Sequence, residues 1–221
     1  MKKENLLFGV IAILGGTIVG YIGTDYLNRS NIPQKTVNRP ADSADTQVQG
    51  EQTGNSDVMA VIEEARKDPR NYDAQMKAGE LFREIKRFEQ ALTFYQNAVS
   101  ARPTDAEANI RLGDTLFDLQ RFEEAAGPYE RALQISPQNA TVRMDLGLTW
   151  FLRTPRDLDR AISEFRTALT IDPRHEKTLQ NLAAALIEKG DKSGAGSIVA
   201  QLAAVNPGNA SLNGFRSKIG E

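Results

Sequence analysis

Four prolines recur at nearly constant spacing through most of this 221-residue chain, and this period constrains the fold more than any other feature. Successive members of the set are separated by 34, 36 and 34 residues: Pro103, Pro137, Pro173 and Pro207. Periods of this size indicate stacked supersecondary units, each of which buries its apolar face against its neighbours. The chain is therefore expected to fold as a repeat array.

Small and aromatic residues recur at fixed positions relative to these prolines. Eight residues before each proline stand Tyr95, Tyr129, Phe165 and Val199, and twelve before stand Ala91, Ala125, Ala161 and Ala195. A second small position recurs in the first half of each unit, at Gly79, Gly113, Gly147 and Ala183. Small residues let two helices cross closely, bulky side chains fill the space beside them, and the proline ends the second helix. Each unit is predicted to be a hairpin of two amphipathic helices.

This pattern resembles the tetratricopeptide repeat (TPR), over residues 72 to 209. The resemblance implies an all-α fold, a right-handed solenoid of helical hairpins that binds other proteins. The repeats are expected at 72–105, 106–139, 140–175 and 176–209, with capping helices at 56–69 and 210–221. A solenoid needs such caps because its end faces would otherwise expose apolar surface.

Two features depart from the resembled pattern. The usual tryptophan at the fourth position of each repeat is replaced by Gln75, Asn109, Arg143 and Leu179, which predicts looser helix contacts or contacts through alkyl stems. The third unit carries two extra residues in its turn, within 153–156. An insertion in a turn is expected to lengthen a loop without disturbing either helix.

The first part of the chain predicts a membrane anchor and a tether. Residues 1–5 form a short tail with two lysines, and residues 6–23 are apolar and uncharged. Eighteen helical residues rise about 27 Å, close to the thickness of a bilayer core, so this segment is expected to be a transmembrane signal anchor. A cleaved signal peptide is the alternative. Residues 24–55 are polar, contain two prolines and are expected to be a flexible linker.

The orientation and packing of the predicted span follow from its flanks and its glycines. Lysines stand before it and basic residues also follow it, so charge alone leaves the orientation open. A lysine-led tail directly before the span favours repeats on the outer side of a cell membrane, the periplasmic side in a bacterium. Gly16 and Gly20 form a GxxxG pair that could pack two spans together, although a single unpaired anchor explains the same glycines.

Composition argues against several classes of function. The formal net charge is −2 with both signs mixed, so no extended basic surface is expected for nucleic acid. There is no cysteine, and the one histidine, His175, is expected in a solvated turn. These counts leave no recognisable catalytic triad or zinc set, and no cofactor or metal is predicted. Paired carboxylates such as Asp114 and Asp118 could in principle catalyse, but a solvated helix face is the preferred interpretation.

In the resembled family, the first helices of the hairpins line a concave groove that takes a peptide or a helix. In the third unit, Leu146 and Trp150 are expected to face the paired helix, which leaves Met144, Leu148 and Phe151 as a second apolar stripe. The predicted protein-binding groove combines this stripe with other apolar residues and with acidic ones around them: Ile110, Phe117, Ile187, Glu80, Asp114, Asp118 and Asp145. The alternative is that the apolar members pack between neighbouring hairpins or in a dimer.

These observations predict a membrane-tethered adaptor or assembly factor. Its partner is expected to be a client protein whose bound segment is apolar with basic residues nearby. The alternative is a structural organiser that self-associates through its GxxxG span. The pattern does not identify the client or the pathway.

Overall fold

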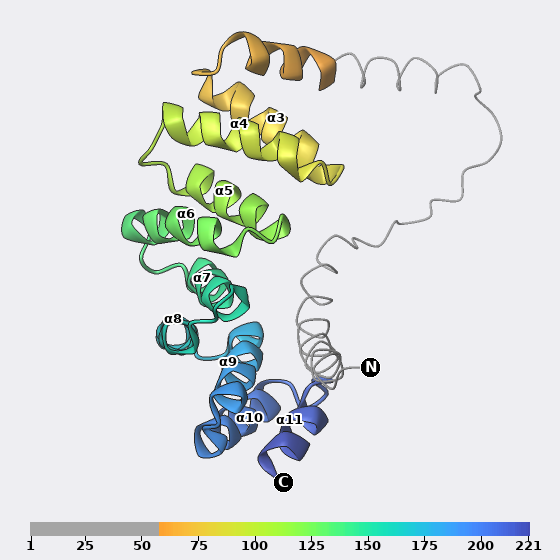
Figure 1. Cartoon of the computed structure of the whole chain (residues 1–221), viewed down its shortest axis with the longest axis vertical. Coiled ribbons are helices and arrows are strands. Elements are labelled where there is room, and N and C mark those ends of the chain that lie inside the picture. Colours follow the sequence, from red (N-terminus) through yellow and green to blue (C-terminus); the bar gives the residue numbers. More distant parts are fainter. Residues whose placement is uncertain (1–57) are drawn as a thin grey trace, which may run out of the picture. The chain divides into compact units, whose positions relative to one another are not determined.

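The computed structural model describes residues 58–221, and every regular element in that range is a helix (Figure 1). A first helix occupies residues 58–67. Nine further helices follow: α3 (Tyr72–Glu84), α4 (Phe88–Ala101), α5 (Ala106–Asp118), α6 (Phe122–Ile135), α7 (Ala140–Leu152), α8 (Leu158–Ile171), α9 (Glu176–Lys189), α10 (Lys192–Val205) and α11 (Leu212–Ile219). The predicted TPR-type helical array is therefore present.

The helices pair into four hairpins that follow one another in chain order (Figure 1). The hairpins are α3 with α4, α5 with α6, α7 with α8, and α9 with α10. The second helix of each hairpin also packs on the first helix of the next, so each unit touches the units before and after it. The short helix α11 packs on α9 and α10 and covers the last hairpin.

The prolines and the polar residues near them separate one hairpin from the next. Helix α4 ends two residues before Pro103, since proline restricts the residue before it and cannot continue the hydrogen-bond ladder. Two residues after the proline, Asp105 caps the N-terminus of α5, where its carboxylate accepts a hydrogen bond from the backbone N–H of Ala108 at 2.8 Å. Asn71 and Asn139 cap α3 and α7 in the same way. A single short motif thus ends one hairpin and starts the next.

Close helix crossing inside each hairpin depends on the small residues. A Cβ placed on Gly113 would lie 2.7 Å from the Tyr129 ring, closer than real contacts allow. Gly79 meets Tyr95 at the same distance, and Gly147 meets the ring of Phe165. The fourth hairpin has Ala183 at this position, opposite the smaller Val199, and both are buried. The size of each small residue therefore matches the bulk of its partner.

The expectation of looser contacts at the fourth repeat position is wrong for Gln75 and Asn109. Both side chains are fully buried and hydrogen-bonded. The amide of Asn109 donates to the carbonyls of Pro103 and Asp105, and its oxygen accepts from Arg131 Nε at 2.9 Å. Gln75 likewise donates to the carbonyl of Ala65, near the end of the first helix, and to that of Asp68 in the turn that follows. Each of these amides satisfies two backbone carbonyls, which a tryptophan at this position could not do with its single donor.

The membrane prediction concerns residues that the structure does not describe. The predicted span at 6–23 with Gly16 and Gly20, and the predicted linker at 24–55, both lie outside residues 58–221. Within the described part of the chain, no helix is long and apolar enough to cross a bilayer. The anchor therefore stays a prediction from the sequence.

Candidate functional site

Most of the predicted apolar groove residues are buried in the packed array. Met144 and Leu148 are 2% and 3% exposed, and Phe151 is fully buried. Phe117 is also buried and contacts Phe122 edge to face, with the ring centroids 5.1 Å apart. A client cannot touch these side chains in this arrangement. Their burial is what the alternative, packing between neighbouring hairpins, predicts.

The remaining members of the predicted set lie nearer the surface, with one exception. Ile110 and Ile187 are half-buried, and so are Glu80, Asp114 and Asp118. The exception is Asp145, which is 4% exposed on α7. The structure therefore separates the set: the acidic residues of the first two repeats lie on α3 and α5, and the buried stripe of Met144, Leu148 and Phe151 lies on α7 of the third repeat.

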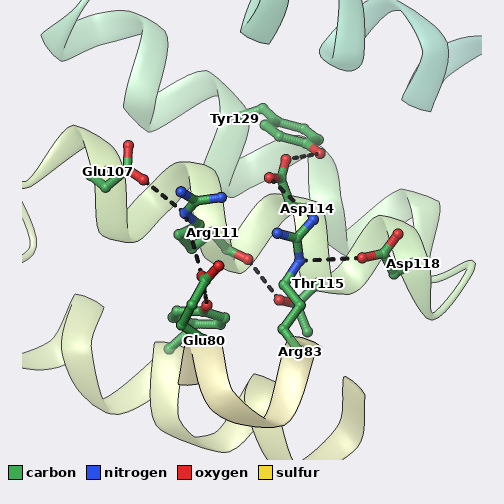
Figure 2. Close-up of polar contacts among 9 residues, drawn as sticks. Glu80, Arg83, Glu107, Arg111, Asp114, Thr115, Asp118 and Tyr129 are labelled. Atoms are coloured by element: carbon green, nitrogen blue, oxygen red, sulfur yellow. Dashed lines mark hydrogen bonds and ion pairs between the residues drawn. The ribbon is translucent and has the colours of Figure 1, made fainter. Parts of the chain in front are cut away.

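The surface on α3 and α5 carries six charged side chains. They are, in chain order, Glu80, Arg83, Glu107, Arg111, Asp114 and Asp118 (Figure 2). We call this set the α3–α5 face. It contains four carboxylates and two guanidinium groups, so its formal charge is −2 when all six are ionised.

Arg83 connects the first two repeats on this face. Its Nη2 lies 3.7 Å from Asp114 Oδ2, and its Nε donates to Asp118 Oδ2 at 3.4 Å (Figure 2). Asp114 and Asp118 are one helical turn apart, so both reach the same guanidinium. All three side chains are mostly shielded from water, with 24%, 14% and 11% exposure for Arg83, Asp114 and Asp118.

The second guanidinium of the face lies in a more open position. Arg111 Nε is 2.7 Å from Glu107 Oε1 on the same helix and 4.0 Å from Glu80 Oε2 on α3 (Figure 2). The Glu80 and Glu107 side chains are about half exposed, at 45% and 53%. These two carboxylates are the ones on the face that an incoming molecule can reach.

Two buried tyrosines orient the acidic side chains from below. The Tyr95 hydroxyl donates to Glu80 Oε2 at 2.9 Å, and the Tyr129 hydroxyl donates to Asp114 Oδ1 at 3.0 Å. Burial and the charge of Glu80 raise the pKa of Tyr95 well above its usual range, so its phenol stays a donor. Each phenol is fully buried and holds one carboxylate of the face by a hydrogen bond.

The sequence interpretation missed these phenol–carboxylate pairs, although a signal was present. In the first two repeats an acidic residue stands 15 positions before the tyrosine. In the third repeat Phe165 replaces tyrosine and Leu148 replaces the acid, and the fourth has Val199 and Ala184. Donor and acceptor therefore occur together or are lost together along the array.

The chemistry available on this face is that of ion pairs and hydrogen bonds. Burial raises the pKa of Asp118 to about 6, Arg83 opposes this shift, and Asp114 adds to it.

Among residues 58–221, no three His, Cys, Asp or Glu side chains are grouped closely enough to hold a metal ion. His175 lies at the N-terminus of α9, where its Nδ1 is 2.6 Å from Thr178 Oγ1, away from the α3–α5 face.

Comparison with known families decides the class of this fold. One tetratricopeptide-repeat model matches residues 60–106, 87–140 and 110–176, and a second matches residues 152–219. The chain belongs to the tetratricopeptide-repeat family. Proteins of this family are typically interaction scaffolds rather than enzymes. No curated protein matches the chain as a relative.

Solved TPR structures share the fold at low sequence identity. MamA is 22% identical, with a TM-score of 0.65, and the match covers 77% of this chain and 99% of MamA. YrrB, a TPR protein with an unusual peptide-binding site, is 16% identical with a TM-score of 0.68, over 77% of this chain and 87% of YrrB. PilF from Pseudomonas aeruginosa is 20% identical with a TM-score of 0.61, over 78% of each chain. At these identities the likeness shows the fold.

Proposed function

We propose that this TPR protein is a membrane-tethered adaptor whose α3–α5 face binds a basic segment of a client protein. The observation that carries the proposal is the pair of half-exposed carboxylates, Glu80 and Glu107, which lie on either side of Arg111 at the open part of the face. Carboxylates held in place lose little freedom on binding, which favours a lysine- or arginine-bearing partner.

Family membership supports the choice of this face. In TPR proteins the first helices of the hairpins line the concave surface that receives peptides, and α3 and α5 are first helices here. YrrB, which has a similar fold, has a peptide-binding site, and this supports a peptide segment as the partner proposed here. The sequence predicted apolar contacts with the client as well, but Met144, Leu148 and Phe151 are buried and do not contribute to this face.

The membrane part of the proposal rests on the sequence alone. The apolar segment at 6–23 would hold the protein at a cell membrane, and the polar segment at 24–55 would let the repeats reach a client. We place the repeats on the outer, periplasmic side because of the lysine-led tail. The alternative role, a self-associating organiser, rests on Gly16 and Gly20.

A charge reversal on the α3–α5 face tests the client site. We expect Glu107→Lys to reduce crosslinking and co-purification of the client from membranes about tenfold, because it replaces an accessible carboxylate by a like charge. The helix should persist, since Glu107 is half exposed and lysine is a good helix former.

The matched control is Glu130→Lys, an exposed position on α6, the second helix of the same hairpin. It changes the net charge equally and should leave client recovery at the wild-type level. Equal recovery from the Glu107→Lys protein, with an unchanged circular dichroism spectrum, would place client binding elsewhere and refute the proposed site.

A further inference from the structure

The seam between the first two hairpins contains the shielded charges of the α3–α5 face, apart from the two half-exposed carboxylates proposed to meet the client. Arg83 comes from α3, and both carboxylates near it, Asp114 and Asp118, come from α5 of the next hairpin. Two carboxylates one turn apart repel each other, so one of them is more easily protonated when both are shielded from water. The cluster therefore joins two repeats through groups whose charge can change.

The surroundings select Asp118 as the carboxyl that takes up the proton. Asp114 accepts a hydrogen bond from Tyr129, which favours its ionised form. Asp118 is the last residue of α5, where the negative end of the helix dipole disfavours a carboxylate. It is also the least exposed of the three side chains. Burial accordingly raises the pKa of Asp118 to about 6, against the pull of Arg83.

The other elements that pack on α5 add little charge near Asp118. Helix α6 presents the neutral phenol of Tyr129. From α4, Glu89 lies 4.0 Å from Arg121, and Arg121 is paired at 2.6 Å with Glu124 in the first turn of α6. The charged side chains that act on Asp118 are Arg83 across the seam and Asp114 on its own helix.

We propose that this seam is a proton-responsive joint: proton uptake at Asp118 tightens the docking of the first hairpin on the second, and proton loss loosens it. When the first hairpin undocks, water reaches Asp118 and its carboxyl recovers an ordinary acidity. Undocking therefore releases a proton near pH 5 and is favoured as the pH rises. The joint is formed by the same two helices, α3 and α5, that carry Glu80 and Glu107, so the pH would also set how rigidly that face is held.

The sign and size of the effect follow from linkage. The pKa of Asp118 is about 6 in the docked state, above its ordinary value of 3.8. Docking is therefore strongest below pH 3.8 and weakens as the pH rises through about 6. This difference in pKa makes undocking roughly tenfold more frequent at pH 7.5 than at pH 5. Above about pH 7.5 no further change is expected from this group.

Hydrogen exchange of the full chain in detergent tests the joint. After correction for the intrinsic pH dependence of exchange, we expect amides of α3 and α4 to open about tenfold more often at pH 7.5 than at pH 5, with α9 and α10 unchanged. Asp118→Asn, which resembles the protonated carboxyl, should remove this difference. Glu124→Gln, on the exposed pair with Arg121, should retain it.

Two outcomes would overturn the proposal. One is equal protection of α3 and α4 at both pH values in the wild-type protein, and the other is a pH response that survives in Asp118→Asn. If that variant does not fold, carboxyl-carbon NMR of the wild-type chain decides the matter. A titration of Asp118 near pH 6 supports the joint, and one near pH 4 rules it out.

Discussion

At the scale of single residues, the turns inside the hairpins hold the clearest local constraint. Lys86, Gln120 and Gly190 occupy the same place between the two helices of their repeats, and all three have a positive φ, of 58°, 59° and 85°. Only glycine adopts this left-handed conformation without a steric penalty. The first two repeats therefore carry local strain that the fourth repeat avoids.

Replacing the strained residue by glycine should stabilise the array. We expect Gln120→Gly to raise the free energy of unfolding by about 1 kcal/mol, measured by urea denaturation, because the penalty for a side chain at positive φ is removed. The opposite change, Gly190→Ala, introduces that penalty and should lower stability by a similar amount. A destabilised Gln120→Gly protein would show that the side chain contributes contacts outweighing the strain.

At the scale of helical elements, the close approach of the two helices in a hairpin depends on one missing Cβ. Gly113 on α5 faces the Tyr129 ring on α6, and that ring also carries the hydroxyl that holds Asp114. Packing and site geometry therefore share one side chain. A shift of the ring would disturb the hairpin core and move a carboxylate on the α3–α5 face together.

Gly113→Ala should destabilise the protein although alanine is the better helix former. The added methyl group would lie 2.7 Å from the ring, and relieving this overlap should lower the unfolding free energy by about 1–3 kcal/mol in urea denaturation.

Gly214→Ala in α11 is the matched control, because nothing lies within 4 Å of a Cβ there. Helix propensity alone should then stabilise the protein by about 0.5–1 kcal/mol. If both variants shift stability in the same direction, helix crossing does not limit residue size at Gly113.

At the scale of the described array, stability is transmitted between neighbouring hairpins. Each hairpin packs on its neighbours along the chain, and α11 covers the last pair, α9 and α10. In such an array a local defect weakens its own unit and its neighbours more than distant ones. Local unfolding is therefore expected to begin at the ends of the array, where a hairpin has one neighbouring hairpin instead of two.

Phe215→Ala should loosen the last hairpin selectively. Phe215 is 8% exposed on α11, and its truncation leaves a cavity against the covered hairpin, which should remove about 3 kcal/mol of local stability. Hydrogen exchange should rise in α9 and α10 and stay unchanged in α3 and α4. Lys218→Ala, exposed on the same helix, should leave the pattern intact. A uniform loss of protection would indicate that the array unfolds as one unit.

The period and identity of residues were enough to predict the helical hairpins, because each repeat carries its own small residues, aromatics and terminating proline within 34 to 36 positions. Local signals of this kind act within one hairpin. The anchor at 6–23 and the linker at 24–55 were also inferred from local composition, and the structure does not test them.

Tertiary structure decided which side chains reach the surface. Leu148 and Phe151 form a second apolar stripe on their helix, and whether such a stripe is open or covered depends on how the neighbouring hairpin is rotated, which the pattern of one helix does not contain. The meeting of Arg83 with Asp118 depends on the same rotation. The repeat period thus determined the elements, and the packing of one hairpin on the next determined the α3–α5 face and the acidity of Asp118.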